Sequence, residues 1–130
     1  MASWYTLGMD MTITMPYLAT ISVNTAYRRG SPRYGKKKVV TEWLADFRLL
    51  IQNQLQLLDY REVPERVRVD VRVFCPRRCG RLPDTENMVK LPTDVLASVI
   101  GLDDAHFTIT SHSAARSDDP CIVFTVQLEP

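Results

Sequence analysis

Hydrophobic and polar residues alternate along two segments, and this period of two predicts β-strands. From Met9 to Met15, Met and Ile alternate with Asp and Thr, and Pro16 ends the run. Residues 66–74 read Arg-Val-Arg-Val-Asp-Val-Arg-Val-Phe, so the valines share one face and the charged side chains share the other. Residues 104–112 and 121–128 are expected to form two final strands, joined by a polar turn at 117–120.

One long segment has apolar residues at helical spacing. A helix is predicted from Val39 to about Leu58, with Thr41 as its expected N-cap. Its apolar face contains Val40, Trp43, Leu44, Phe47, Leu50, Ile51, Leu55 and Leu58.

A second helix is predicted from about Glu86 to Val99. Pro92 lies inside this segment, so its first turn is expected to be separate or kinked. Gly101 is expected to end it. The element order is therefore β-α-β-α-β-β. This order favours an α+β fold in which two helices cover a mixed sheet of about four strands.

Composition limits the class of protein. The chain has 130 residues, of which 45% are hydrophobic, so one globular domain spanning 1–130 is expected. No apolar stretch reaches the ~18 residues of a membrane helix, residues 1–15 do not resemble a secretory signal, and no membrane partner is expected. The three cysteines favour a reducing, cytoplasmic location over a disulfide framework.

Charge is distributed unevenly along the chain. Residues 1–90 contain 15 basic and nine acidic residues, whereas residues 91–130 contain one basic and six acidic residues. Two segments, 28–38 and 77–81, contain no acid and are expected to be loops because Gly and Pro interrupt or flank them. Their basic residues are Arg28, Arg29, Arg33, Lys36, Lys37, Lys38, Arg77, Arg78 and Arg81.

Acidic residues before and after the second helix are candidate metal ligands. Asp84 and Glu86 lie two apart, so in an extended segment both carboxylates face one side. If residues 104–112 are a strand, Asp104 lies on its polar face and can join them. Carboxylate oxygens suit Mg²⁺, and Lys90 could then stabilise charge on a bound phosphate. Helix-end acids and an exposed i,i+4 pair between Glu86 and Lys90 explain the same pattern without a metal.

The sequence of residues 84–104 resembles the RusA family of Holliday junction resolvases. The family pattern is Asp-x-Asp-Asn-x-x-Lys, then Asp-x-Leu, then an Asp-Asp pair. Here the matching stretches are 84–90, 94–96 and 103–104. An upstream Pro16 and the Ser-Val-Asn stretch at 22–24 also match.

This resemblance implies a Mg²⁺-dependent endonuclease that cuts four-way DNA junctions as a homodimer in DNA recombination and repair. Asp84, Glu86 and Asp104 fall on the family's metal-binding acids, and Lys90 falls on its catalytic lysine. Glu86 departs from the family pattern, which has Asp there. The extra methylene of Glu86 moves its carboxylate by about one bond length, and a displacement on the order of 1 Å can lower a catalytic rate ~10²-fold. The two basic segments would hold the DNA backbone.

Other functions are open at this point. Because Glu86 departs from the family pattern, a branched-DNA-binding module that does not cleave is an open alternative. A nuclease for flapped DNA is a third alternative. Two cysteines and two histidines could in principle bind zinc. This is disfavoured because the two histidines would lie ~20 Å apart on one strand. These four residues are Cys75, Cys79, His106 and His112.

Overall fold

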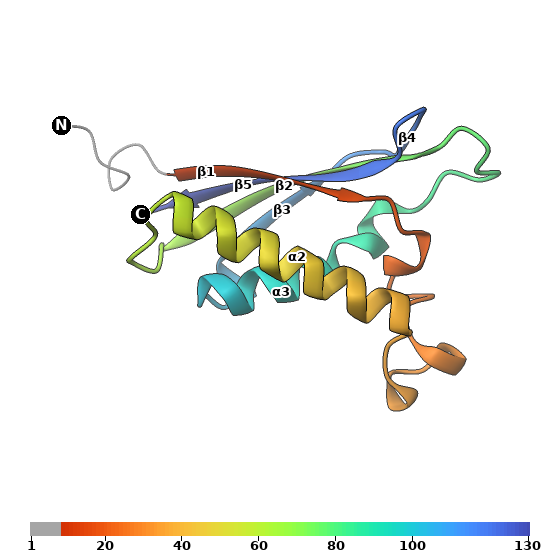
Figure 1. The fold of residues 1–130 in the computed structure, drawn as a ribbon, viewed down its shortest axis with the longest axis horizontal. Coiled ribbons are helices and arrows are strands. Elements are labelled where there is room, and N and C mark those ends of the chain that lie inside the picture. Colours follow the sequence, from red (N-terminus) through yellow and green to blue (C-terminus); the bar gives the residue numbers. More distant parts are fainter. Residues whose placement is uncertain (1–8) are drawn as a thin grey trace.

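A computed structural model describes residues 9–130 and contains a five-stranded, open, mixed sheet (Figure 1). Strand order along the sheet is β1-β5-β2-β3, and the short β4 also pairs with β2. β5 is antiparallel to β1 and β2, whereas β3 and β4 run parallel to β2. The strands are β1 (Met9–Pro16), β2 (Arg66–Pro76), β3 (Phe107–Ser111), β4 (Ala115–Ser117) and β5 (Cys121–Glu129). The α+β prediction is confirmed.

The alternating segments form the strands as predicted. In β2, Val67, Val69, Val71 and Val73 are almost fully buried, while Arg66 and Arg68 are exposed. Val69 pairs with Val126 of β5, so the apolar faces of neighbouring strands lie in register. Burying each valine relative to leaving it exposed contributes ~1.5–3 kcal/mol, which is enough to select this face.

β4 is the strand that periodicity does not predict. Pairing between β3 and β2 ends at Val71, and β4 then pairs with Phe74–Pro76 at the far end of the same strand. Three residues are too few for a period of two to be visible. The expected single strand over residues 104–112 is therefore corrected to a shorter β3 followed by a separate β4.

The long helix, α2 (Lys38–Leu57), covers one face of the sheet together with α3 (Figure 1). Phe47 of α2 is fully buried, and its ring centroid lies 4.6 Å from that of Phe124 in β5. The Trp43 indole N–H donates a hydrogen bond of 2.8 Å to the Pro16 carbonyl, which ties the helix to the end of β1. The N-cap is Lys37 rather than the predicted Thr41, because helical hydrogen bonding already begins before Thr41.

The second helical segment is divided, as the proline predicted. A 3₁₀ turn, η4 (Thr85–Met88), precedes α3 (Lys90–Ile100). Pro92 lies in the first turn of α3, where its missing N–H removes no helical hydrogen bond. Gly101 ends α3 in the left-handed conformation, with φ of 84°. The Tyr60 hydroxyl donates to the Ile100 carbonyl at 2.6 Å.

Among residues 9–130, no helix is long and apolar enough to cross a membrane. Residues 1–8 lie outside the part of the chain that the structure describes, so the expectation about a secretory signal largely falls outside it.

Candidate functional site

Asp84, the first predicted metal ligand, serves as the N-cap of the 3₁₀ turn η4. Its Oδ1 accepts a hydrogen bond from the Glu86 backbone N–H at 3.1 Å. Its Oδ2 accepts one from the Asn87 side-chain amide at 3.3 Å. Both oxygens therefore bind donors of the turn that they begin, which is a common role for Asp at a helix N-terminus.

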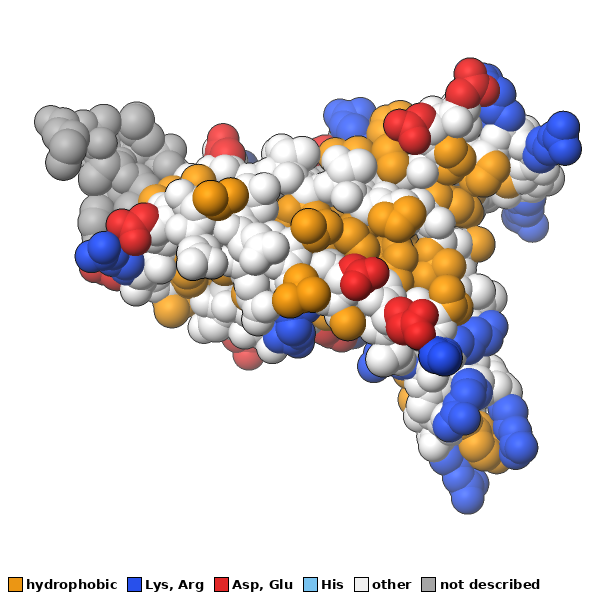
Figure 2. All heavy atoms as spheres, in the orientation of Figure 1, with side chains coloured by type: hydrophobic (Ala, Val, Ile, Leu, Met, Phe, Trp, Pro, Cys, Tyr) orange, Lys and Arg blue, Asp and Glu red, His pale blue; other side chains and the backbone are white. Residues whose placement is uncertain are grey.

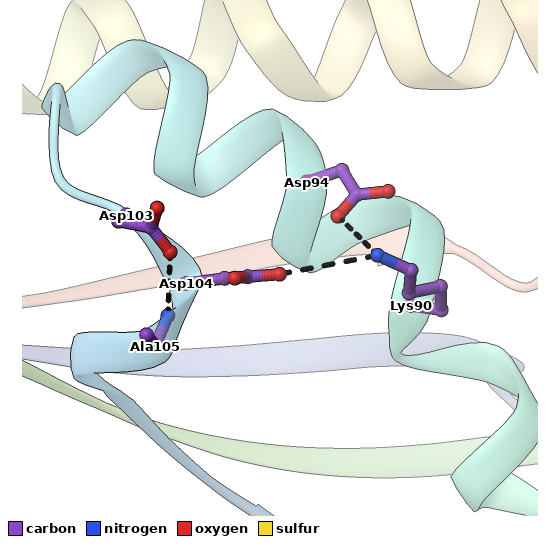
Figure 3. A network of polar contacts seen from close by, with 5 residues as sticks. All are labelled: Lys90, Asp94, Asp103, Asp104 and Ala105. Carbon is purple, nitrogen blue, oxygen red and sulfur yellow. Dashed lines mark hydrogen bonds and ion pairs between the residues drawn. The ribbon is translucent and has the colours of Figure 1, made fainter.

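Asp104, the third predicted ligand, lies in a different group of polar contacts. Lys90 Nζ is 2.8 Å from Asp94 Oδ1 and 3.9 Å from Asp104 Oδ2, as Figure 3 shows. The hydrogen bond and the charge of Asp94, with a smaller contribution from Asp104, raise the pKa of Lys90. This lysine is therefore held between two carboxylates of α3 and the following turn. It does not pair with Glu86, because α3 begins only at Lys90.

The expected backbone at Asp104 is wrong. Asp104–His106 form a 3₁₀ turn, η5, and β3 begins only at Phe107. Asp103 caps this turn, since its Oδ1 accepts a hydrogen bond from the Ala105 N–H at 2.9 Å (Figure 3). That hydrogen bond, followed by one with the Asp104 side chain, lowers the pKa of Asp103. Strand alternation therefore does not decide where these side chains point.

Asp84, Glu86 and Asp104 consequently do not assemble into a metal site. Within residues 9–130, no group of three or more His, Cys, Asp or Glu side chains is arranged to hold a metal ion. Asp84 and Glu86 instead line a depression of about 350 Å³ together with His112. The His112 ring is hydrogen-bonded to Asp70 of β2. The residues present do not fit a Mg²⁺ shared by the three acids, and Mg²⁺ binding stays a prediction.

The first basic segment, here called the basic arm (residues 28–38), is an ordered projection rather than an irregular loop. It contains two 3₁₀ turns, η2 (Arg28–Gly30) and η3 (Pro32–Tyr34). A β-bridge between Tyr27 and Lys36 closes its base, and Arg28 Nε donates to the Tyr34 carbonyl at 2.8 Å. In Figure 2, Lys and Arg side chains gather on the projection that leads into α2.

The cations of the basic arm have almost no acidic neighbours. Among the described residues, its only ion pair joins Lys38 to Glu42 at 3.8 Å, and both side chains are exposed. The guanidinium carbons of Arg29 and Arg33 lie 4.9 and 5.8 Å from the centroid of the Tyr34 ring. Tyr34 thus holds two arginines together at the surface without neutralising them.

The second basic segment, the arginine loop (residues 77–81), is partly neutralised. Arg77 forms an ion pair with Asp118 in the turn before β5. Arg116 of β4 donates to the backbone carbonyls of Cys79 and Gly80, at 3.4 and 2.9 Å. Arg116 was not identified from the sequence, because it lies 36 residues from the carbonyl that it binds best and no local pattern marks it.

The chain is similar to solved structures, but it matches no family model. No curated protein matches it either. Similar solved structures include three of the periplasmic domain of Helicobacter pylori MotB. The one spanning MotB residues 97–256 is 13% identical with a TM-score of 0.44, and covers 92% of this chain and 81% of that one.

The other two MotB structures resemble this chain to a similar degree. Those spanning residues 78–256 and 90–256 are each 12% identical with TM-scores of 0.42. Each covers 93% of this chain, and 78% and 75% of the other chain respectively. With TM-scores below 0.5, no property of MotB is carried over to this chain.

These findings correct the resolvase identification. The resemblance to the RusA family is wrong: the similar solved structures are MotB domains, and the predicted metal ligands do not assemble. The predicted endonuclease activity, the four-way or branched DNA partner and the non-cleaving DNA-binding alternative are withdrawn with it. So is the homodimer that paired junction cuts would require. The predicted cytoplasmic location is withdrawn as well: the similar solved structures are of periplasmic domains, and at these TM-scores they assign no location to this chain.

Proposed function

We propose that this chain is a non-enzymatic binding domain that attaches to a phosphate-bearing polyanion through its basic arm. The observation that carries the proposal is the lack of neutralisation. Six cations lie within residues 28–38, and among the described residues only Lys38 is paired with an acid. A polyanion can therefore bind this surface without first breaking internal ion pairs.

The size of the effect can be estimated from elementary electrostatics. A basic residue close to an anionic surface contributes ~1 kcal/mol. Contacts with three of the six cations would therefore give ~3 kcal/mol and contacts with all six ~6 kcal/mol. These energies correspond to dissociation constants from the order of 10 mM down to roughly 50 μM, since about 1.4 kcal/mol corresponds to a tenfold change. Binding should weaken with salt, because the Debye length is about 10 Å at 0.1 M ionic strength.

The shape of the arm suits an extended ligand. It projects from the body of the protein beside the start of α2 (Figures 1 and 2). Arg29 and Arg33 are exposed, and guanidinium groups bind phosphate oxygens in a bidentate manner. The hydrogen bond from Arg28 N–H to the Gly35 carbonyl, at 2.9 Å, keeps the arm folded before any ligand arrives. Little ordering entropy is then lost on binding.

The test compares two variants that lose the same charge at opposite ends of α2. Arg33→Gln/Lys36→Gln removes two exposed cations from the arm. Arg61→Gln/Arg66→Gln removes two exposed cations beyond the other end of this helix of 20 residues, which is about 30 Å long. Both variants have the same net charge, so a difference in affinity does not report total charge. It reports position together with pairing, because Arg61 is paired with Asp59 at 3.2 Å.

The probes are inorganic polyphosphate, heparin and phosphatidylglycerol vesicles, each titrated at two salt concentrations. We expect the arm variant to bind polyphosphate at least ~10-fold more weakly than the wild type. The control variant should change affinity by less than about twofold. Vesicle binding without polyphosphate binding would assign the ligand to a lipid surface. Binding to heparin alone would assign the ligand to sulfate-bearing rather than phosphate-bearing polyanions. Equal losses in the two variants, or no binding to any probe, would overturn the proposal.

A further inference from the structure

Two thiols lie in contact where β2 ends and the arginine loop begins. Cys75 is the penultimate residue of β2 and is fully buried, and Cys79 is half-buried in the loop. Their Sγ atoms are 2.9 Å apart. A disulfide has an S–S length of about 2.05 Å, so a further approach of roughly 0.9 Å would form the bond.

The surrounding backbone holds the two thiols in this arrangement. The Cys79 N–H donates to the Pro76 carbonyl at 3.0 Å, which closes a turn between the two cysteines. Cys75 pairs with Arg116 across the β2–β4 ladder. The Arg116 guanidinium in turn donates to the carbonyls of Cys79 and Gly80. Strand and loop are therefore fixed on both sides of the sulfur pair, and little backbone movement is needed to join them.

We propose that Cys75 and Cys79 are a redox-sensitive dithiol that a small-molecule disulfide oxidises to an intrachain disulfide. The half-buried Cys79 thiolate attacks one sulfur of the disulfide RSSR and expels RS⁻, which gives a mixed disulfide on Cys79. Cys75, after losing its proton, attacks the Cys79 sulfur and expels the second RS⁻. The balance is two protein thiols and one RSSR giving one protein disulfide and two RSH.

The two cysteines have different roles because they are buried to different extents. Burial, followed by the hydrogen bond with Cys79, raises the pKa of the Cys75 thiol. Cys75 is therefore a poor first nucleophile, yet it is placed to resolve a mixed disulfide on its neighbour. A zinc site at the same place would need further ligands. Within residues 9–130 no group of three His, Cys, Asp or Glu side chains is arranged to hold a metal.

The Cys75–Cys79 disulfide would affect the part of the surface that carries two cations of the arginine loop. The bond would close the segment that carries Arg77 and Arg78, so oxidation would fix the backbone of these two exposed cations. This inference is independent of the proposed function, because the basic arm takes no part in it.

Cys121 provides an internal control. It opens β5 and pairs with Phe74, so it lies on the neighbouring strand without sharing the sulfur contact. Cys121→Ser should therefore leave oxidation unchanged. Cys79→Ser should abolish the disulfide. Cys75→Ser should stop the reaction at a glutathione adduct on Cys79, and Cys75→Ala gives a second variant if the serine disturbs folding at this buried position.

The experiment equilibrates the folded full chain in mixtures of reduced and oxidised glutathione, alkylates the remaining thiols and maps the linkages by mass spectrometry. We expect a Cys75–Cys79 linkage in the wild type and in Cys121→Ser. We also expect its equilibrium constant to fall about tenfold or more in urea, where the fold no longer holds the thiols together. A stable glutathione adduct on wild-type Cys79, a linkage that includes Cys121, or an equal constant in urea would overturn the proposal.

Discussion

The basic arm and the arginine loop contain the same types of residue, yet their surroundings differ. The arm has six cations and one exposed pair with an acid, among the residues described. The loop has three arginines, of which Arg77 is paired with Asp118. Arg116 holds the loop backbone, whereas the arm is closed by its own hydrogen bonds. A run of basic residues therefore indicates a binding surface only where the fold leaves it unneutralised.

The two segments differ in neutralisation because they lie against different parts of the molecule. The arginine loop faces the turn that joins β4 to β5, which contains Asp118 and Asp119. In Figure 2 acidic and basic side chains lie together at that corner of the molecule, whereas the tip of the basic arm shows basic ones. An ion pair between an exposed cation and an acid at contact distance stabilises the folded protein by roughly 1 kcal/mol. That acid also competes with any external anion for the cation.

The largest expected effect comes from removing three charges from each segment in turn. Arg29→Gln/Arg33→Gln/Lys36→Gln should weaken polyphosphate binding by about 100-fold, because each lost contact costs ~1 kcal/mol. Arg77→Gln/Arg78→Gln/Arg81→Gln should weaken it by less than ~10-fold. Titration at constant salt measures both. Equal effects would remove the distinction between the segments.

A smaller effect is expected from releasing Arg77. Asp118→Asn removes the acid that neutralises it, so the loop should contribute more to polyanion binding, by up to about fivefold in affinity. The same change should lower the free energy of unfolding by no more than ~1 kcal/mol, because the pair is exposed. Asp119→Asn changes the net charge equally and is the control. An unchanged affinity in Asp118→Asn would show that the pair does not restrain Arg77.

A change of a few fold is expected at Tyr34. Tyr34→Ala removes the ring over which Arg29 and Arg33 lie, and each contact is worth ~0.5–1 kcal/mol at an exposed position. Affinity should fall about threefold to fivefold, since both guanidinium groups lose their orientation. Tyr34→Phe retains the ring and should bind like the wild type. A loss of affinity in both variants would assign the effect to the hydroxyl instead.

The smallest effect is expected at Lys90, which belongs to neither basic segment. Its folded pKa is raised chiefly by Asp94, so the pair contributes stability below the unfolded pKa of Lys90. That contribution is lost as pH rises through the folded pKa, above the ordinary value of 10.5. Asp94→Asn should lower the free energy of unfolding by ~0.2–1 kcal/mol at neutral pH, measured in urea, and should leave polyanion binding unchanged. A difference in unfolding free energy between the wild type and Asp94→Asn that was largest at high pH would contradict the predicted pH dependence.

Much of the fold follows from local pattern. The valines of β2 alternate because one face is buried, and Pro92 and Gly101 mark the turn and the end of α3 for reasons internal to the backbone. β4 could not be predicted in this way. Its three residues form a strand only because β2 extends beyond β3 and offers unpaired backbone groups.

The candidate site was less predictable than the fold. The expected grouping of Asp104 with Asp84 depended on strand alternation, but Asp104–His106 adopt a 3₁₀ turn. Both Asp84 oxygens bind donors within their own turn, while Asp104 approaches Lys90. Spacing along the chain shows which carboxylates lie near a helix end. It does not show which donors already occupy them.

The order of residues thus determined the strand faces, the helices and the position of two cationic segments, because these depend on neighbours within a few residues. Only the tertiary structure decided which charges are neutralised and which sulfur atoms touch. Asp118 lies 41 residues from Arg77, and Arg116 lies 37 residues from Cys79. Contacts over such separations form when the sheet assembles, and electrostatic and sulfur chemistry depend on those final distances.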